Sequence, residues 1–547
     1  MGKMIRRTDI VALLKKTRRG MRKRPSGKFM KQRTKSAGVK KNGAAENEAA
    51  AAAVKPEEIR MDAAPKVSAD KVFHYFREIA GIPHGSGHTK AISDHIVSFA
   101  KERDLFCVQD ELNNVIITKE ATPGYEDAPP IALQGHIDMV LASRSDKDID
   151  MLTEPVTVIT EDDWMHADGT TLGADNGIAA AMMLAVLDDD TITHPLLECI
   201  FTSDEEIGLI GAAGIDLSEL KSRRLLNLDN EKEGVFCAGC AGGADAVCEL
   251  PVKRRHKAGR CLTIRLSGLS GGHSGAEIHL GRANGNRLLA RALYRIYDRI
   301  PFRLVRIEGG DANNAIPPHA LAKIQFPAAV DTELVEKILK EQADEMADEF
   351  RSADPGMKWE TEWEPASREY VVTKNDTIHL LRFLMALPTG ITHMSTEIPG
   401  MPQTSLNLGV IGTEVNKVRA DFMVRSGINS QGQFTLDRLA SLAAGFGADF
   451  TVRSSYPAWE YREESPLRDL AVNTYRKYTG KEPVVEVIHA GLECGVLSGK
   501  LPGLDCLSTG PDLENVHTVN ERMSISSAEN VWNFVVALLK EAALTVE

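Results

Sequence analysis

The stretch Leu172-Gly173-Ala174-Asp175-Asn176-Gly177 places one carboxylate in a glycine-flanked turn, directly before the apolar run of residues 178–187. Asp and Asn are common first residues of helices, and the glycines permit a backbone turn that a β-branched residue would resist. Read alone, this stretch predicts the capped start of a helix. Asp175 is then held on a tight turn and points away from the helix that it opens.

Four other stretches give Asp175 a chemical role beyond helix capping. Each ends a short apolar run that is typical of a strand, and together they hold two histidines and three separate acidic positions. They are Gln134-Gly135-His136-Ile137-Asp138, Ser203-Asp204-Glu205-Glu206-Ile207-Gly208, Asn227-Leu228-Asp229 and Asn515-Val516-His517. Gathered around Asp175, these side chains would form a site for two metal ions.

The chain has 547 residues, which is too long for one hydrophobic core and predicts two domains or three. Its 43% hydrophobic and 26% charged residues are ordinary for a soluble globular protein. The sequence holds no apolar run of about 18 residues, the length that spans a bilayer. We therefore expect no membrane association.

The net charge of −12 combines a basic N-terminus with an acidic body. Residues 1–41 carry 16 Lys and Arg against one acid, Asp9. Taking these from the totals of 65 basic and 77 acidic residues leaves 49 and 76, a net charge of −27. An acidic body is a poor general binder of nucleic acid, so a nucleic-acid partner is not expected.

Residues 1–65 are basic and then Ala-rich, with hardly an aromatic residue. Such a segment cannot bury enough apolar area to offset chain entropy, so we expect a disordered extension, with Met61 close to the start of the compact chain. It lacks the apolar core of a secretory signal. A transit peptide and a tail for an anionic surface are the functional alternatives, and a dispensable extension is the interpretation that we prefer.

The eight cysteines show no disulfide-like framework for a chain of this length. This predicts a reducing compartment, and we expect the cytoplasm. Cys237-Ala238-Gly239-Cys240 has the spacing of a redox or zinc motif but lies in a Gly/Ala-rich turn without other thiol signals. We expect no redox or zinc role for it.

Between residue 66 and residue 245, short apolar runs alternate with helical periodicity. This pattern predicts an α/β domain with a mostly parallel sheet and helices on its faces, whose ligands gather at the carboxyl ends of the strands. Residues 246–452 instead alternate apolar with polar residues between helical segments, which predicts an inserted α+β domain with an antiparallel sheet. The first pattern returns over 453–547, so we expect a catalytic domain in two parts.

The residue types at the strand ends suit a metal-dependent hydrolase. In an extended strand, residues two apart face the same way, so Asp138 can orient His136 through the second ring nitrogen. Of the adjacent pair Glu205 and Glu206, one carboxylate can bind metal while the other takes a proton from water. Histidine and carboxylate ligands with an open position suit Zn²⁺, with Mn²⁺ or Co²⁺ as alternatives.

As an ordered set, these motifs resemble the co-catalytic zinc peptidases of the aminoacylase/carnosinase superfamily. Within it, the chain is most similar to the aminoacyl-histidine dipeptidases, also called Xaa-His or cytosolic non-specific dipeptidases. The resemblance runs from about residue 66 to the C-terminus. It is extended by Ile82-Pro83-His84, Ser270-Gly271-Gly272-His273-Ser274-Gly275, Asn314-Ala315-Ile316-Pro317 and His489-Ala490-Gly491-Leu492-Glu493.

The resemblance implies a role for each matching residue. His136 and Asp229 would hold one metal ion, Glu206 and His517 the other, and Asp175 would bridge the two. Asp138 would orient His136, and Glu205 would be the general base. The implied substrate contacts are His273, Arg425, Asn314 and Gly491. In this family the histidine that matches His273 often reaches the substrate across a homodimer made by the inserted domains.

The predicted function is therefore metal-dependent hydrolysis of dipeptides, Xaa-His dipeptides among them. An N-acyl amino acid deacylase or a tripeptidase of the same superfamily is the alternative. A non-catalytic metal-binding or interaction protein would be expected to lack Glu205 or a ligand, and none is missing. The length of the insert, about 200 residues, favours the dipeptidase by resemblance.

Deletion of residues 1–60 should leave peptide hydrolysis and the melting temperature essentially unchanged, because this segment has no apolar periodicity with which to dock. Activity assays and thermal unfolding of the truncated chain check this. A truncated chain that unfolds or loses turnover would show that the extension is part of the fold.

Overall fold

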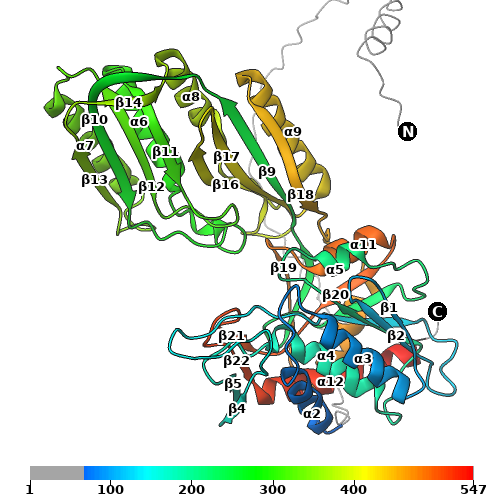
Figure 1. Ribbon diagram of the computed structural model, residues 1–547. Coiled ribbons are helices and arrows are strands. Elements are labelled where there is room, and N and C mark those ends of the chain that lie inside the picture. The colour runs from blue at the N-terminus through cyan, green and yellow to red at the C-terminus, as the bar shows by residue number, and fades with distance from the viewer. Residues whose placement is uncertain (1–66, 546–547) are drawn as a thin grey trace, which may run out of the picture. The chain divides into compact units, whose positions relative to one another are not determined.

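The computed structural model describes residues 67–545, and Figure 1 shows how their helices and strands are arranged. The extension predicted for residues 1–65, with Met61, lies outside the described residues. Within the described part, no helix is both long enough and apolar enough to cross a membrane.

The predicted catalytic domain is built on a mixed eight-stranded sheet. Its strands, in spatial order, are β1 (Phe106–Gln109), β2 (Val115–Lys119), β6 (Leu197–Thr202), β3 (Ile131–His136), β7 (Arg224–Asn227), β20 (Asp505–Ser508), β8 (Val235–Cys240) and β19 (Val484–Ile488). The central strands β6, β3, β7 and β20 run parallel, so their carboxyl ends meet at one edge. The fold class is as predicted, with antiparallel pairs toward the two sides.

Helices cover both faces of this sheet, because apolar side chains alternate between two cores. One core joins the sheet to α2 (Asp70–Ala80), α3 (Lys90–Glu102), α4 (Ala174–Leu187), α10 (Pro466–Thr479) and α12 (Ile525–Leu544). The other core joins it to α5 (Ile210–Gly214) and α11 (Glu493–Lys500).

Helix α4 is the apolar run that follows Asp175, and every side chain from Ile178 to Leu187 is buried. A helix that is apolar all round is stable only inside a core, and α4 lies between the sheet and α2. Asp175 and Asn176 keep non-helical backbone angles, so the regular helix begins after them. The start of α4 is thereby held next to the end of β3.

A small antiparallel sheet carries the last of the predicted ligands. Its strands, in order, are β21 (Leu513–Glu514), β22 (Arg522–Ser524), β5 (Trp164–Ala167) and β4 (Val158–Glu161). His517 lies in the loop between β21 and β22. Strand β22 leads directly into α12, so the C-terminal helix anchors this loop.

The inserted domain is a ten-stranded antiparallel sheet that repeats one arrangement twice. Half A is β10 (Arg254–Ser267), α6 (Gly285–Arg299), β11 (Arg303–Gly309), β12 (Ala320–Phe326), α7 (Thr332–Glu349) and β13 (Lys358–Trp363). Half B is β9 (Gly242–Pro251), α8 (Lys374–Ala386), β16 (Pro402–Thr413), β17 (Lys417–Ser426), α9 (Asn429–Phe446) and β18 (Asp449–Tyr456). Strands β14 (Ser367–Val372) and β15 (Gly390–Met394) pair beside β10 and β16.

Each half runs strand, helix, strand, strand, helix, strand, and each places its fourth strand at an outer edge. The spatial order is β13-β10-β12-β11 in half A and, from the other edge, β18-β9-β17-β16 in half B. The second strands, β11 and β16, pair and join the halves. Helices α6, α7, α8 and α9 pack on one face of this continuous sheet and leave its other face uncovered by helices (Figure 1).

The chain enters the ten-stranded sheet at Gly242 and leaves it at Tyr456. The limits expected from the sequence, 246 and 452, fall inside β9 and β18, because both strands begin or end in small and polar residues without a clear pattern. We propose residues 242–456 as the inserted domain.

The junction between the halves depends on Gly409 in β16. A Cβ atom on Gly409 would lie 2.4 Å from the Cα atom of Asn313 and 2.6 Å from the carbonyl oxygen of Ala312. Both are backbone atoms and cannot rotate away. The absence of a side chain at Gly409 therefore lets the loop before Asn314 pack against β16.

Gly409→Ala should lower the stability of the inserted domain by about 1–3 kcal/mol, the usual effect of overpacking, and should displace the loop that holds Asn314. Thermal unfolding measures the effect. Gly412→Ala on the same strand is the matched control, because a Cβ there meets no atom within 4 Å. Equal melting temperatures for the two variants would contradict the packing argument.

Candidate functional site

The predicted ligands come from five separate segments that meet at the carboxyl edge of the parallel strands. His136 ends β3, Asp229 lies two residues beyond β7, and Glu206 lies four residues beyond β6. Asp175 lies at the start of α4, and His517 lies in the loop after β21. Because β6, β3 and β7 are adjacent and parallel, their ends necessarily lie side by side.

Asp175 lies between the two histidines, and each of its carboxylate oxygens faces one of them. His136 Nε2 lies 3.2 Å from Asp175 Oδ1, and His517 Nε2 lies 3.1 Å from Asp175 Oδ2. His136 Nε2 is also 3.5 Å from Asp229 Oδ1, and His517 Nε2 is 2.8 Å from Glu206 Oε1. The ligand atoms of His136, Asp175 and Glu206 all lie within 4.8 Å of one another, a separation that suits metal binding.

Asp138 holds both His136 and the pair of adjacent glutamates. His136 Nδ1 lies 3.0 Å from the Asp138 carbonyl oxygen and 3.4 Å from Asp138 Oδ1. The buried carboxylate of Asp138 accepts hydrogen bonds from the backbone N–H groups of Glu205 (2.9 Å) and Glu206 (3.3 Å) and from the hydroxyl of Ser86 (2.8 Å). Asp138 therefore fixes the main chain that presents the two glutamates, as well as the histidine.

Glu521 is a structural support of the site that sequence reasoning missed. Its two carboxylate oxygens accept the backbone N–H groups of residues 172–175 at 2.8 to 3.3 Å, and the side chain is 2% exposed. The side chain of Asp175 makes no capping hydrogen bond, and Glu521 instead accepts the free N–H groups at the start of the helix. The carboxylate of Asp175 is thereby free to face the histidines.

Acidic side chains outnumber histidines among the predicted site residues at this edge of the sheet. Burial raises the pKa of Asp229 to about 6, and burial with nearby carboxylates raises the pKa of Glu205 well above its usual range. Hydrogen bonds that the His517 ring donates to the carboxylates of Asp175 and Glu206 raise the pKa of His517 to about 11. The pKa of Asp175 is held low, because the hydrogen bonds from His136 and His517 outweigh burial. An electrostatic environment of this kind attracts cations.

A second cluster, rich in hydrogen-bond donors, comes from the inserted domain. Arg425 Nη1 donates to the Tyr456 hydroxyl at 3.1 Å, and Arg425 Nη2 lies 3.2 Å from His273 Nε2. His273 Nδ1 accepts the Ala276 N–H at 3.0 Å, so a neutral His273 ring carries its proton on Nε2. Two donors thus face one another, an arrangement that an anion between them would satisfy.

Arg425 is 4% exposed, and its Nε atom has no hydrogen-bond partner. Among residues 67–545, no carboxylate forms an ion pair with it. A buried guanidinium without a counter-charge is costly unless a ligand supplies one.

The other two predicted substrate contacts lie beside this cluster. The carbonyl oxygen of Asn314 accepts the N–H of Ser274 at 2.8 Å, next to His273, and the Asn314 side chain is exposed. Gly491 packs against the ring of Tyr456, where a Cβ would lie 2.7 Å from the nearest ring atom. The structure therefore brings all four predicted substrate contacts to one region.

Cys237 and Cys240 lie in β8 with buried side chains, and burial raises the pKa of their thiols to about 12 and about 11. Protonated, buried thiols are inert toward redox partners.

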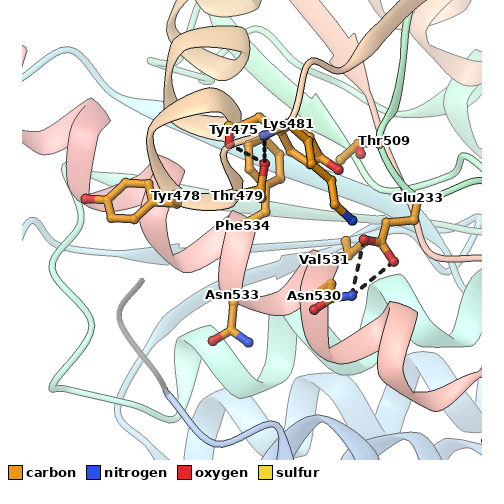
Figure 2. Close-up of a pocket in the computed structure, with 11 residues that line it drawn as sticks. Glu233, Tyr475, Tyr478, Thr479, Lys481, Thr509, Asn530, Val531, Asn533 and Phe534 are labelled. Atoms are coloured by element: carbon orange, nitrogen blue, oxygen red, sulfur yellow. Dashed lines mark hydrogen bonds between the residues drawn. The ribbon is translucent and has the colours of Figure 1, made fainter. Parts of the chain in front are cut away.

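A separate cavity of about 320 Å³ lies between α10, α12 and the loop at Glu233, where Asn530 Nδ2 donates to both carboxylate oxygens of Glu233 at 3.2 Å (Figure 2). Its floor is formed by the buried side chains of Tyr475, Val531 and Phe534. None of the predicted site residues lines it.

Comparison with known proteins identifies a family for this chain. Residues 132–541 match the model of the peptidase family M20/M25/M40. The chain is 34% identical to the cytosol non-specific dipeptidase of Escherichia coli over 88% of this chain and 99% of that protein. The chain belongs to this peptidase family.

Solved structures show the same fold. The crystal structure of aminoacylhistidine dipeptidase from Vibrio alginolyticus is 35% identical and superposes with a TM-score of 0.79, covering 88% of this chain and 98% of that one. Aminopeptidase PepT from Bacillus cereus, at 16% identity, shares the fold with a TM-score of 0.51 over 87% of this chain and 100% of that one.

Glu521→Gln should lower stability by about 1–3 kcal/mol, because an amide cannot accept the four N–H groups that the carboxylate accepts. Thermal unfolding measures this. Glu514→Gln is the matched control, since Glu514 lies nearby on the small sheet, is exposed, and forms an ion pair with Arg522. If both variants melt alike, the backbone of residues 172–175 does not depend on Glu521.

Proposed function

We propose that this chain hydrolyses dipeptides, Xaa-His dipeptides among them, with two divalent metal ions as cofactors. The observation that carries the proposal is the position of Asp175, whose two carboxylate oxygens face a histidine each, with Glu206 and Asp229 beside them. The names of the relatives from Escherichia coli and Vibrio alginolyticus, both dipeptidases, support the substrate class.

The donor set fits two divalent ions. His136 and Asp229 would hold one, Glu206 and His517 the other, and Asp175 would bridge them. Nitrogen and carboxylate ligands in this ratio suit Zn²⁺, and Mn²⁺ or Co²⁺ fit the same donors. Ions bound there would supply Lewis-acid activation of water and of the peptide carbonyl.

Glu205 is the proposed proton carrier. Its backbone is fixed by Asp138, and burial together with the charges of its neighbours raises the pKa of its side chain. A carboxylate of raised pKa takes a proton from the attacking water and returns it to the leaving amine more readily. Its neighbour Glu206 faces His517, so the two adjacent glutamates have different roles.

The cluster around Arg425 is the proposed substrate subsite. Arg425 would bind the C-terminal carboxylate of the dipeptide, and the Nε2–H group of His273 would donate to the oxyanion that develops on the peptide carbonyl. Asn314 and Gly491 would line the same region. The donors of Arg425 and His273 support the first two assignments, and the positions of Asn314 and Gly491 beside them support the other two.

We further propose a cytoplasmic homodimer that forms through the inserted domains. His273 and Arg425 of the same chain already contact one another, so a dimer is not needed to bring them together. Sedimentation of the purified protein tests the oligomeric state.

The activity is tested with metal-reconstituted protein and a panel of dipeptides, tripeptides and N-acetyl amino acids. Fast turnover of dipeptides supports the proposal. Faster turnover of the N-acetyl amino acids or the tripeptides would assign the chain to a deacylase or tripeptidase instead.

Glu205→Gln should lower kcat by about 10²–10⁴-fold, because an amide keeps the size of the side chain but cannot carry the proton. Metal content and substrate binding should survive. Glu206→Gln should instead lose one ion, because an amide is a poor ligand for a divalent cation. Metal analysis and single-turnover rates on both variants check this, and the opposite pattern would reverse the two roles.

A further inference from the structure

A row of residues crosses half B on the face that helices leave uncovered. Ser405 in β16 pairs with Arg425 in β17, Arg425 pairs with Gly243 in β9, and Gly243 pairs with Tyr456 in β18. Residues in register on neighbouring strands project from the same face of a sheet. Ser405, Arg425 and Tyr456 therefore share a face, opposite to the core residues such as Val424.

Gly243 makes the contact between Arg425 and Tyr456 possible. A Cβ atom on Gly243 would lie 2.5 Å from the ring of Tyr456, so any side chain there would displace the ring. With glycine in the middle of the row, the Tyr456 hydroxyl reaches Arg425 across the strand between them.

His489 adds a group from the other domain to this row. It follows β19 of the eight-stranded sheet, is 5% exposed, and places Nε2 at 2.7 Å from the hydroxyl oxygen of Ser405. Its Nδ1 atom is buried and has no hydrogen-bond partner. Burial and the nearby charge of Arg425 lower the pKa of His489 to about 3, so the ring is neutral.

The tautomer of this neutral ring follows from whether the Ser405 hydroxyl donates to Nε2 or accepts from it. If the Ser405 hydroxyl donates to Nε2, the proton of His489 is on Nδ1, which is then a buried donor without an acceptor. Such unpaired groups are rare in folded proteins, and a bound ligand, ion or water is what supplies their partner.

His489, Arg425 and His273 come together next to Gly275. A Cβ atom on Gly275 would lie 2.5 Å from the carbonyl oxygen of His489, 3.0 Å from Arg425 Nε and 3.0 Å from the ring of His273. Gly275 thus marks a point that all three residues surround.

The Ser405–His489 contact is not a nucleophilic pair. Ser405 is 1% exposed, and in the described part of the chain no carboxylate binds His489 Nδ1 to orient the ring as a base. The contact instead fixes the ring with Nδ1 turned away from Ser405.

We propose that His489, held by Ser405, is a specificity-determining residue that donates from Nδ1 to the free C-terminal carboxylate of the substrate, beside Arg425. The inference rests on the proposed dipeptidase function and names the group that makes the site select a free carboxylate. A peptide amide, which lacks the negative charge, gains little from this donor.

The test compares L-alanyl-L-histidine with its C-terminal amide on metal-loaded wild-type protein and on His489→Ala. The alanine variant should raise KM for the free acid about tenfold, the effect of losing one hydrogen bond to a charged group. Its kcat and metal content should be nearly unchanged, and its KM for the amide should hardly move. His393→Ala, which replaces an exposed histidine of the inserted domain, is the control.

Two conservative variants distinguish hydrogen-bond donation by His489 Nδ1 from a purely structural role of the side chain. The side-chain nitrogen of Asn at position 489 lies near the place of Nδ1, whereas that of Gln lies near the place of Nε2. His489→Asn should therefore restore part of the preference for the free acid, and His489→Gln should not. Equal rescue by both, or an equal loss on acid and amide in His489→Ala, would overturn the proposal and leave His489 a structural role.

Failure of the proposed function has a different signature. Wild-type protein that hydrolyses neither probe would refute the dipeptidase function. Calorimetric binding of the acid and the amide to wild-type protein and to His489→Ala then still decides the role of His489. A weaker binding of the acid alone by the variant supports the proposal, and unchanged binding of both overturns it.

Discussion

Mutual repulsion of carboxylates at one buried edge is the constraint on which the rest of this structure depends. Asp138, Asp175, Glu205, Glu206 and Asp229 meet there beside His136 and His517. Burying like charges together is strongly unfavourable unless hydrogen bonds or cations offset them. Two features of the fold offset this repulsion. Backbone N–H groups donate to some of the carboxylates, and the others form a site that suits cations.

Backbone donors decide which carboxylates are structural. Asp138 accepts the N–H groups of Glu205 and Glu206, and Glu521 accepts those of residues 172–175. The carboxylates of Asp175, Glu206 and Asp229 face the histidines instead, so they are the ones that suit metal ions. The proposed metal ligands are thus the carboxylates that lie beside an imidazole without backbone donors. The supporting carboxylates are those that accept backbone N–H groups.

The inserted domain presents the opposite electrostatic character. Arg425, His273 and His489 contribute donors, and within the described residues no carboxylate pairs with Arg425. The segment from His489 to Glu493 connects the two regions. His489 contacts Ser405, Gly491 packs on Tyr456, and Glu493 accepts hydrogen bonds from Gln134 and Thr202 beneath the ligand-bearing strands. This short segment therefore contacts both the donor-rich region and the acidic one and holds them side by side.

The sequence by itself determined the α/β character of the larger sheet, the presence of an inserted antiparallel domain, and the residues that could bind metal. It could do so because buried strands and helices need apolar periodicity, and because metal chemistry needs histidine and carboxylates at strand ends. Tertiary structure alone decided the repeated halves of the insert and the roles of Ser86, Ser405, His489 and Glu521. Glu521 meets the backbone of Asp175 from 346 residues away, and His489 meets Ser405 from 84. Serine, histidine and glutamate are common in any chain. Only the folded backbone brings these particular residues next to their buried hydrogen-bond partners.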